Sequence, residues 1–400
     1  MANTLKFGNG EWYGKKDTIL AYNDENSNYK PLPFNFSRAS KATRVNKDGL
    51  IEEVGSGQPR VDYKDDSKGA LLLEPARTNS LPYSANFSTW SATGGASVVG
   101  NKLGVGGGSD AFEFFSDGTA NTRLYYSLSN TGELSFSVFA KKNTLDYIAL
   151  YGNGGANPRV WFNLANGTLG NQEGAGTGSI ESYGNGWYRC TMNWTSASLV
   201  NVRIYNSNEN DVFGGTAGSV FMQYAQVEAG SYPTSYIPTS GSAVTRLGDE
   251  CTNAGNDQVI NSSEGVLYAE ISTKTDDADK AISISDGSTN NRIWVGYSTI
   301  NKRAYALGYS GSTLQFVFFK NLVNEEDMIK VACRYKQDDF SFWVDGVKEG
   351  EDTSGLTPIG MNELSFNIGT VSGSFYGNVK DVRVYNTALT DAELEELTTL

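Results

Sequence analysis

Seven polar and aromatic side chains alternate with apolar ones along three strand-like segments in the middle of the chain. Residues 146–151 (DYIALY), 159–164 (RVWFNL) and 201–205 (NVRIY) all show this period of two. Because successive side chains of a strand point to opposite faces, one face is apolar and the other collects the aromatic, arginine and asparagine side chains. Aromatic rings stack on the C–H face of a sugar, and Arg and Asn bind its hydroxyls. The candidate carbohydrate-binding residues are therefore Tyr147, Tyr151, Arg159, Trp161, Asn163, Arg203 and Tyr205.

The same pattern has a purely structural explanation. Aromatic side chains on the outer face of a strand can cover a second sheet, pack under the N-terminal region, or form a subunit interface. Carbohydrate binding and these structural roles both remain open at this point.

Residues suited to catalysis are scarce. The chain has no histidine, which removes the commonest general base and metal ligand. A glycan-degrading site needs two carboxylates close together, and the candidate acids lie in polar turns. They are Asp276, Asp277, Asp279, Asp338 and Asp339. We expect no catalytic residues and no enzymatic activity.

Composition indicates an all-β protein of two to three domains. The chain has 400 residues, with 45 Gly, 22 Tyr and 19 Phe, and its apolar runs are short and separated by Gly, Asn and Asp. The net charge of −13 disfavours a nucleic-acid partner, because phosphate backbones are repelled. No apolar run is long enough for a transmembrane helix, and the N-terminus lacks the features of a signal peptide.

The predicted architecture is two tandem antiparallel β-sandwiches, both jelly rolls, preceded by an extended N-terminal attachment region. The proline-rich residues 1–84 form that region, and we expect them to pack on the first sandwich or on a neighbouring subunit. Residues 85–246 form the first sandwich, the polar residues 247–264 a linker, and residues 265–400 the second sandwich. A helix capped by Thr390 is predicted near the C-terminus, and Cys190 and Cys333 are expected to be buried free thiols.

Several short phrases of the N-terminal half resemble a segment common in bacteriophage tail-fibre, head-fibre and other virion proteins. They are residues 36–46 (FSRASKATRVN), 49–52 (GLIE), 59–63 (PRVDY) and 71–79 (LLLEPARTN), followed by 226–239 (QVEAGSYPTSYIPT) and 243–246 (AVTR). In that family a jelly-roll module follows the first phrases. Residues 184–190 (GNGWYRC) are similar to a strand entry seen in carbohydrate-binding modules.

The C-terminal region resembles the laminin-G or concanavalin-A-like lectin fold. The resemblance rests on residues 340–347 (FSFWVDGV) and 377–394 (GNVKDVRVYNTALTDAEL). Glycosidases of that fold carry a Glu-x-Asp-x-x-Glu strand motif, which this sequence lacks. The resemblance leaves a structural Ca²⁺ open, for which residues 286–291 (DGSTNN) have suitable oxygen ligands, although a plain turn fits them equally well. No cofactor is expected to be required.

The sequence therefore predicts a virion structural protein with an adhesive role, made in the host cytoplasm. Its N-terminal region would bind other virion proteins, and its sandwiches would bind cell-surface glycans. We expect a homo-oligomer, with no nucleic-acid partner and no membrane insertion. Two alternatives remain: an architectural capsid or tail decoration protein that binds no sugar, and, less favoured, a polysaccharide-degrading enzyme.

Overall fold

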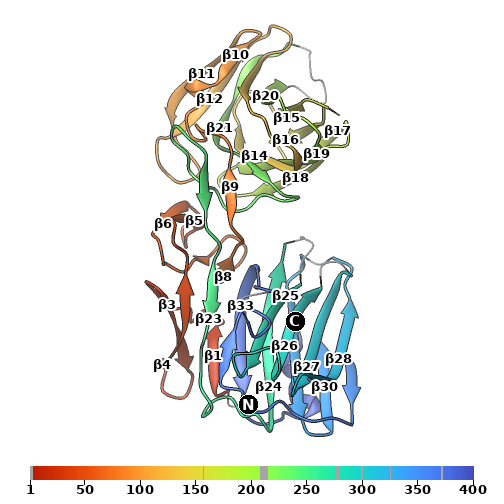
Figure 1. Ribbon diagram of the computed structural model, residues 1–400. Coiled ribbons are helices and arrows are strands. Elements are labelled where there is room, and N and C mark those ends of the chain that lie inside the picture. Colours follow the sequence, from red (N-terminus) through yellow and green to blue (C-terminus); the bar gives the residue numbers. More distant parts are fainter. Residues whose placement is uncertain are drawn as a thin grey trace. The chain divides into compact units, whose positions relative to one another are not determined.

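The computed structural model describes residues 3–155, 157–207, 215–274, 279–298, 301–324, 326–370 and 373–400. The chain divides into two compact units, each built from antiparallel β-sheets (Figure 1). We call Ala42–Glu53 with Ala76–Arg246 the first module, and Met1–Lys41, Val54–Pro75 and Leu247–Leu400 the second module. The all-β prediction is confirmed, but the modules are nested rather than tandem, because segments of the second module lie on both sides of the first in the sequence.

The first module is a sandwich of two six-stranded sheets. One sheet runs in the spatial order β10 (Ser91–Thr93), β13 (Arg123–Ser127), β20 (Asn201–Ser207), β15 (Tyr147–Asn153), β16 (Arg159–Asn163) and β17 (Thr168–Glu173). The other runs β11 (Ala96–Lys102), β12 (Ala111–Asp117), β21 (Ala217–Ala229), β14 (Gly132–Lys142), β19 (Trp187–Ser196) and β18 (Thr177–Ser182). Smaller elements are β5 (Ala42–Val45), β6 (Ile51–Val54), β9 (Arg77–Asn79), β22 (Val244–Arg246) and the 3-10 helix η1 (Phe87–Thr89).

The core of the first module follows from the alternation of its strands. Ile148 and Leu150 of β15 are fully buried, as are Val160 and Phe162 of β16. These apolar residues meet Phe136 and its neighbours on β14, so the two inner faces make one hydrophobic cluster. The opposite face of β15, β16 and β20 is left for other contacts.

The second module contains an eight-stranded and a five-stranded sheet. The larger runs β31 (Val347–Asp352), β30 (Asp339–Val344), β29 (Ile329–Lys336), β24 (Glu264–Thr273), β33 (Gly377–Tyr385), β8 (Ala70–Leu73) and β7 (Val61–Asp62), and β1 (Leu5–Gly8) also pairs with β33. The smaller runs β28 (Thr313–Asn321), β27 (Arg303–Ser310), β26 (Arg292–Ser298), β25 (Lys280–Ser285) and β32 (Glu363–Ser365). A four-stranded sheet of β2 (Gly14–Lys15), β3 (Thr18–Asn23), β4 (Asn28–Ser37) and β23 (Glu250–Thr252) completes the module.

The prediction of a separate N-terminal region over residues 1–84 is wrong. Strand β1 pairs with β33 from Leu5 opposite Val384 onwards, and β8 pairs with the start of the same strand. Leu5, Phe7 and Leu71 are buried in the same hydrophobic cluster as β33. These N-terminal pieces are too short to make a core of their own, so they complete the sheet of the second module instead.

The predicted linker over residues 247–264 is also wrong. It contains β23, which pairs with β4, and Cys251, Ala254 and Ile260 are buried in the core of the second module. Its apolar residues are few and lie between turn-forming residues, so no periodic pattern marked the segment as structured.

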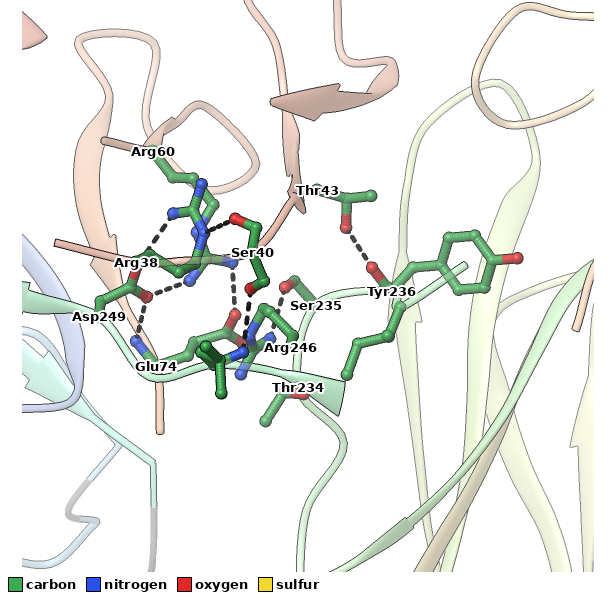
Figure 2. Close-up of polar contacts among 12 residues, drawn as sticks. Arg38, Ser40, Thr43, Arg60, Glu74, Thr234, Ser235, Tyr236, Arg246 and Asp249 are labelled. Atoms are coloured by element: carbon green, nitrogen blue, oxygen red, sulfur yellow. Dashed lines mark hydrogen bonds and ion pairs between the residues drawn. The ribbon is translucent and has the colours of Figure 1, made fainter. Parts of the chain in front are cut away.

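A buried ionic cluster of four residues joins the three segments of the second module (Figure 2). Asp249 accepts hydrogen bonds from Arg38, at 2.9 Å, and from Arg60, while Arg60 also binds Glu74 at 2.5 Å. The backbone N–H of Glu74 donates to Asp249 at 2.8 Å. Burial lowers the pKa of Arg60, but the charges of Asp249 and Glu74 more than offset this and raise the pKa above its ordinary value. Three of the phage-like phrases therefore contribute charged residues to the interior of the chain.

The phrase at residues 226–239 is likewise internal, within the first module. The fully buried Glu228 accepts hydrogen bonds from Gln226, at 2.7 Å, and from Thr234, at 2.9 Å to the backbone nitrogen. Gln226 in turn accepts from the backbone of Ile237 at 2.6 Å. This network fixes the segment that follows β21, because every one of these buried polar groups has a partner.

Two smaller predictions are confirmed. Helix α1 (Asp391–Thr398) begins after Thr390, which forms a capping box with Glu393. The three cysteines are free and buried, and burial raises the pKa of each thiol. No helix among the described residues is long and apolar enough to cross a membrane.

Candidate functional site

The seven residues singled out in the sequence lie on one face of the β13–β20–β15–β16 sheet. One cross-strand row consists, in spatial order, of Tyr125, Arg203, Tyr151, Arg159 and Glu173. The neighbouring row consists of Arg123, Tyr205, Ala149 and Trp161. Tyr147 and Asn163 form a further pair, joined by a hydrogen bond of 2.8 Å. We call the surface made by these two rows and this pair the arginine face.

Three aromatic rings of the arginine face are buried, which corrects the expectation that they could stack on a sugar, while Tyr147 and Tyr125 are half-buried. The exposed fractions of Tyr151, Trp161 and Tyr205 are 7%, 0% and 1%. With Ala149, these three residues form a small hydrophobic cluster of their own. The indole nitrogen of Trp161 has no hydrogen-bond partner among the residues that the structure describes.

Arginine side chains cover these rings. The guanidinium carbons of Arg203 and Arg159 lie 4.7 and 5.0 Å from the ring centroid of Tyr151, and Arg123 lies 5.8 Å from that of Tyr205. Guanidinium groups stack on aromatic rings because the ring face is negative. What the face offers to a ligand is therefore the partly exposed edge of each arginine, while the rings serve as their support.

A second outward face carries aromatic residues, on the five-stranded sheet of the second module. Its cross-strand rows alternate with core residues such as Ile293, Ala304 and Phe316. The outward rows are, in order, Arg292–Tyr309–Leu314, Trp294–Leu307–Val317, Gly296–Tyr305–Phe319 and Ser298–Arg303–Asn321. We call this surface the aromatic face.

Three rings of the aromatic face, one from each of three strands, lie next to one another. Trp294 and Tyr305 lie nearly parallel, with centroids 6.0 Å apart, and Tyr305 lies 6.1 Å from Phe319. Phe319 is 45% exposed and its neighbour Val317 is 44% exposed. The guanidinium carbon of Arg303 lies 4.1 Å from the centroid of Phe319, so one side of that ring is covered and the rest is open.

Such a face is unusual for an antiparallel sheet. Outward faces of antiparallel sheets are ordinarily polar, and contiguous exposed apolar patches mark binding sites. Arg292 borders the patch, stacked at 4.7 Å over Tyr309, and burial lowers its pKa below the ordinary value. The arrangement can hold a flat apolar ligand surface while the flanking arginines and Asn321 donate hydrogen bonds to its polar edge.

Sequence reasoning missed the aromatic face, although a signal was present. In residues 303–310 (RAYALGYS), small residues alternate with large ones. Ala304, Ala306 and Gly308 point inward and are buried, while Tyr305 and Leu307 point outward. Because both sets are apolar, the segment has the pattern of a strand buried on both faces, and the small size of the inner residues was the only clue.

The candidate calcium loop is a closed turn. The carboxylate of Asp286 accepts hydrogen bonds from the backbone and side chain of Ser288, at 2.9 and 2.6 Å, and from Asn291 at 2.9 Å. Burial raises the pKa of Asp286, but these hydrogen bonds outweigh this effect and hold the pKa below its ordinary value. No group of three His, Cys, Asp or Glu suited to a metal occurs in the described parts of the chain. The carboxylate of this loop is already engaged within the turn, so the residues present do not fit a hard-cation site.

Two of the acidic turn residues are engaged in local contacts. Asp338 accepts from the backbone of Gly355 at 3.0 Å, and Asp339 binds Arg334 at 2.7 Å. Asp276 and Asp277 lie outside the described residues. Asp279 lies just before β25.

The comparisons with known proteins give one family match and several distant structural likenesses. Residues 252–395 match the family model of the concanavalin A-like lectin/glucanases superfamily. Solved structures with some likeness include the Ruminococcus gnavus IT-sialidase CBM40, at 16% identity over 36% of this chain and 92% of that one, with a TM-score of 0.31. Domain 4 of the Geobacillus stearothermophilus GH43 arabinanase AbnA shares 10% identity over 43% of this chain and 84% of that one, with a TM-score of 0.30.

A third solved structure is that of domains LG4-5 of the mouse laminin alpha1 chain, at 11% identity over 70% of this chain and 91% of that one, with a TM-score of 0.23. Scores this low do not define what the present chain binds. No curated protein matches the chain in sequence. The C-terminal part of the chain, residues 252–395, is thus similar to concanavalin A-like lectins and glucanases, and it supplies most of a sandwich that carries the aromatic face.

Proposed function

We propose that this chain is a non-enzymatic glycan-binding protein of a bacteriophage particle, and that it binds glycan on the aromatic face. The observation that carries the proposal is the pair of neighbouring rings, Tyr305 and Phe319, that reach solvent on an outward sheet face, with the buried Trp294 packed behind Tyr305. That face belongs to the region that matches the lectin and glucanase family.

The chemistry of the aromatic face suits a sugar. The C–H face of a pyranose packs on an aromatic ring, and the hydroxyl groups around its edge need hydrogen-bond partners. Phe319 and Tyr305 supply the rings, and Arg303 lies beside them with its Nε already oriented by Asn321 at 2.9 Å. Single contacts of this kind are weak, and display of many copies on a particle raises their combined affinity.

The virion assignment is supported by the phage-like phrases of the sequence. Those phrases lie inside the chain's own modules, and β1 and β8 are already paired with β33. These two strands are therefore not available to extend a sheet of a neighbouring virion protein. The proposal retains attachment through the N-terminal segment, with the exposed residues around β2 as the contact surface.

In this proposal the protein binds glycans, catalyses no reaction and needs no cofactor. Two other functions compete with it: an architectural decoration protein that binds no sugar, and an enzyme that degrades polysaccharide. Binding to glycans separates the proposal from the first, and release of reducing sugar separates it from the second.

The test is a glycan array probed with the full chain, multimerised to raise its avidity. Selective binding should be lost in Phe319→Ala and Tyr305→Ala. Tyr13→Ala is the matched control, because Tyr13 is an aromatic residue of the same module with 40% exposure and lies in another sheet region. Thermal unfolding should confirm that all variants fold.

A blank array from folded multimer would overturn glycan binding and favour the architectural alternative. Binding that survives both aromatic substitutions would remove the aromatic face as the site. Reducing ends released from a bound polysaccharide would replace the proposal with an enzyme.

A further inference from the structure

The arginine face of the first module concentrates positive charge on an acidic protein. The chain carries a net charge of −13, yet the two cross-strand rows of this face contain three arginines and one carboxylate, Glu173, among their described residues. Glu173 binds Arg159 at 3.1 Å. Local clusters of one sign create a field that attracts ligands of the opposite sign.

The guanidinium groups of this face are held in place before any ligand arrives. Arg203 lies over Tyr151, its Nε donates to Asn201 at 2.7 Å, and an Nη donates to the hydroxyl of Tyr205 at 3.3 Å. Arg159 approaches Tyr151 from the neighbouring strand on the other side. Arginines fixed in this way lose little side-chain entropy when they bind an anion.

Arg123 supplies the third positive group. It stacks on Tyr205, and its buried Nε has no hydrogen-bond partner among the described residues. Tyr125 lies in the row beside it, next to Arg203. The face therefore combines cations with hydroxyl and amide groups, which also include Tyr147 and Asn163.

We infer that the arginine face binds the anionic group of an acidic sugar, a carboxylate or a sulfate on an otherwise neutral glycan. Arginine pairs with such groups through two parallel hydrogen bonds. The surrounding tyrosine and asparagine side chains suit the neighbouring sugar hydroxyls. A dense polyanion such as a nucleic acid is disfavoured, because the net charge of the whole chain repels it.

This site is separate from the proposed function of the aromatic face and uses different chemistry. It lies in the first module, and its rings are covered by arginines. One site can therefore fail while the other holds, and the experiment below reads both.

The test uses the full chain and a sensor surface coated with xylotriose that carries one glucuronic acid. The methyl ester of the same sugar has the same shape without the charge. We expect the acid to be bound and the ester to be bound at least about tenfold more weakly, since a charge-assisted hydrogen bond is about twice as strong as a neutral one. A galactose disaccharide with one sulfate distinguishes sulfate from carboxylate as the preferred group.

Arg203→Met should weaken binding of the acidic sugar about tenfold, and Arg203→Lys should restore part of it. Arg44→Met is the matched control, because Arg44 is a partly exposed arginine of the same module that lies in β5, outside both faces. If Arg203→Met does not fold, Arg123→Met serves the same purpose. Phe319→Ala should keep the preference for the acid over its methyl ester, because the charge is read on the arginine face, and this separates the site from the proposed one.

Equal binding of the acid and its methyl ester would overturn the inference. So would binding of the acid that is unchanged in folded Arg203→Met and Arg123→Met variants. Tighter binding of an eight-nucleotide oligothymidylate than of the acidic sugar would replace the sugar with a nucleic acid.

Discussion

The arginine face and the aromatic face both combine aromatic and arginine side chains, but different side chains reach the solvent. On the arginine face the rings of Tyr151 and Tyr205 are buried and guanidinium groups lie above them. On the aromatic face the rings of Tyr305 and Phe319 reach solvent and the arginines stand at the border. Both are outward faces of an antiparallel sheet in a β-sandwich.

The difference teaches that residue type does not decide whether an aromatic side chain is available to a ligand. Its cross-strand neighbours decide. Tyr151 has an arginine on each neighbouring strand in the same row, whereas Tyr305 has Gly296 on one side and Phe319 on the other. A long cation beside a ring covers it, and a glycine beside a ring leaves it open.

The largest effect should come from the buried ionic cluster of the second module, which is the module that carries the aromatic face. Asp249→Ala leaves Arg38 and Arg60 buried without their shared carboxylate, and breaking a buried pair in this way costs about 3–5 kcal/mol. Hydrogen exchange measured by mass spectrometry should show the loss of protection in β24 and β33, with β14 and β19 unchanged. Equal loss in both modules would show that the two faces do not rest on separate scaffolds.

The rings of the two faces should differ in their contribution to stability. Trp161→Ala removes a fully buried ring and should lower the free energy of unfolding by about 3–5 kcal/mol. Phe319→Ala removes a half-exposed ring and should lower it by about 1 kcal/mol or less. Urea unfolding of both variants measures the two values, and similar losses would contradict the comparison.

Salt should separate the ligands of the two faces. Raising the NaCl concentration from about 0.1 to about 1 M shortens the screening length from about 10 to about 3 Å. Binding of an acidic sugar at the arginine face should then weaken by about three- to tenfold, and binding of a neutral sugar at the aromatic face should not. The sensor surfaces described above measure both, and Arg203→Met should show a smaller salt effect than the wild type, because Arg123 and Arg159 remain.

The smallest effect concerns the stability of the first module at low pH. Binding to the arginine face can be measured only at pH values where this module stays folded. Burial raises the pKa of Glu113, but hydrogen bonds from Lys102 and Ser219 outweigh this effect and hold the pKa below its ordinary value. A carboxylate with a lowered pKa stabilises the fold above its unfolded value and loses that effect as the pH falls through the folded value. The stability difference between the wild type and Glu113→Gln should therefore shrink as the pH drops below about 4.5. Thermal unfolding at several pH values checks this, and a difference that persists at low pH would exclude Glu113 as its source.

Much of the fold could be predicted from the sequence, because it depends on local alternation. Strands such as β15 and β16 show their inner face directly, since Ile148, Leu150 and Val160 repeat every second residue. Helix α1 could be predicted because its cap and its two buried leucines lie within a few residues of each other. The gathering of the seven candidate residues on one sheet face followed from the same alternation.

The burial of those residues could not be predicted in this way. It depends on which strands are neighbours, and Arg203 reaches Tyr151 only because β20 pairs with β15. The nested order of the modules was missed for a similar reason. The pairing of β1 with β33 joins residues from opposite ends of the chain, and short extended segments carry no sign of their distant partner.

The pairing of β1 with β33 also sets the order in which the two modules can fold during synthesis. The first module is complete once residue 246 has been made, so it can fold while the ribosome is still active. Strands β1 and β8 are made before most of the first module and must wait for β33, which is made after it. Until then their edges are exposed to pairing with other nascent chains, which is the usual origin of aggregation in β-proteins. Slow synthesis of the segment between residue 246 and β33 would therefore prolong this exposure.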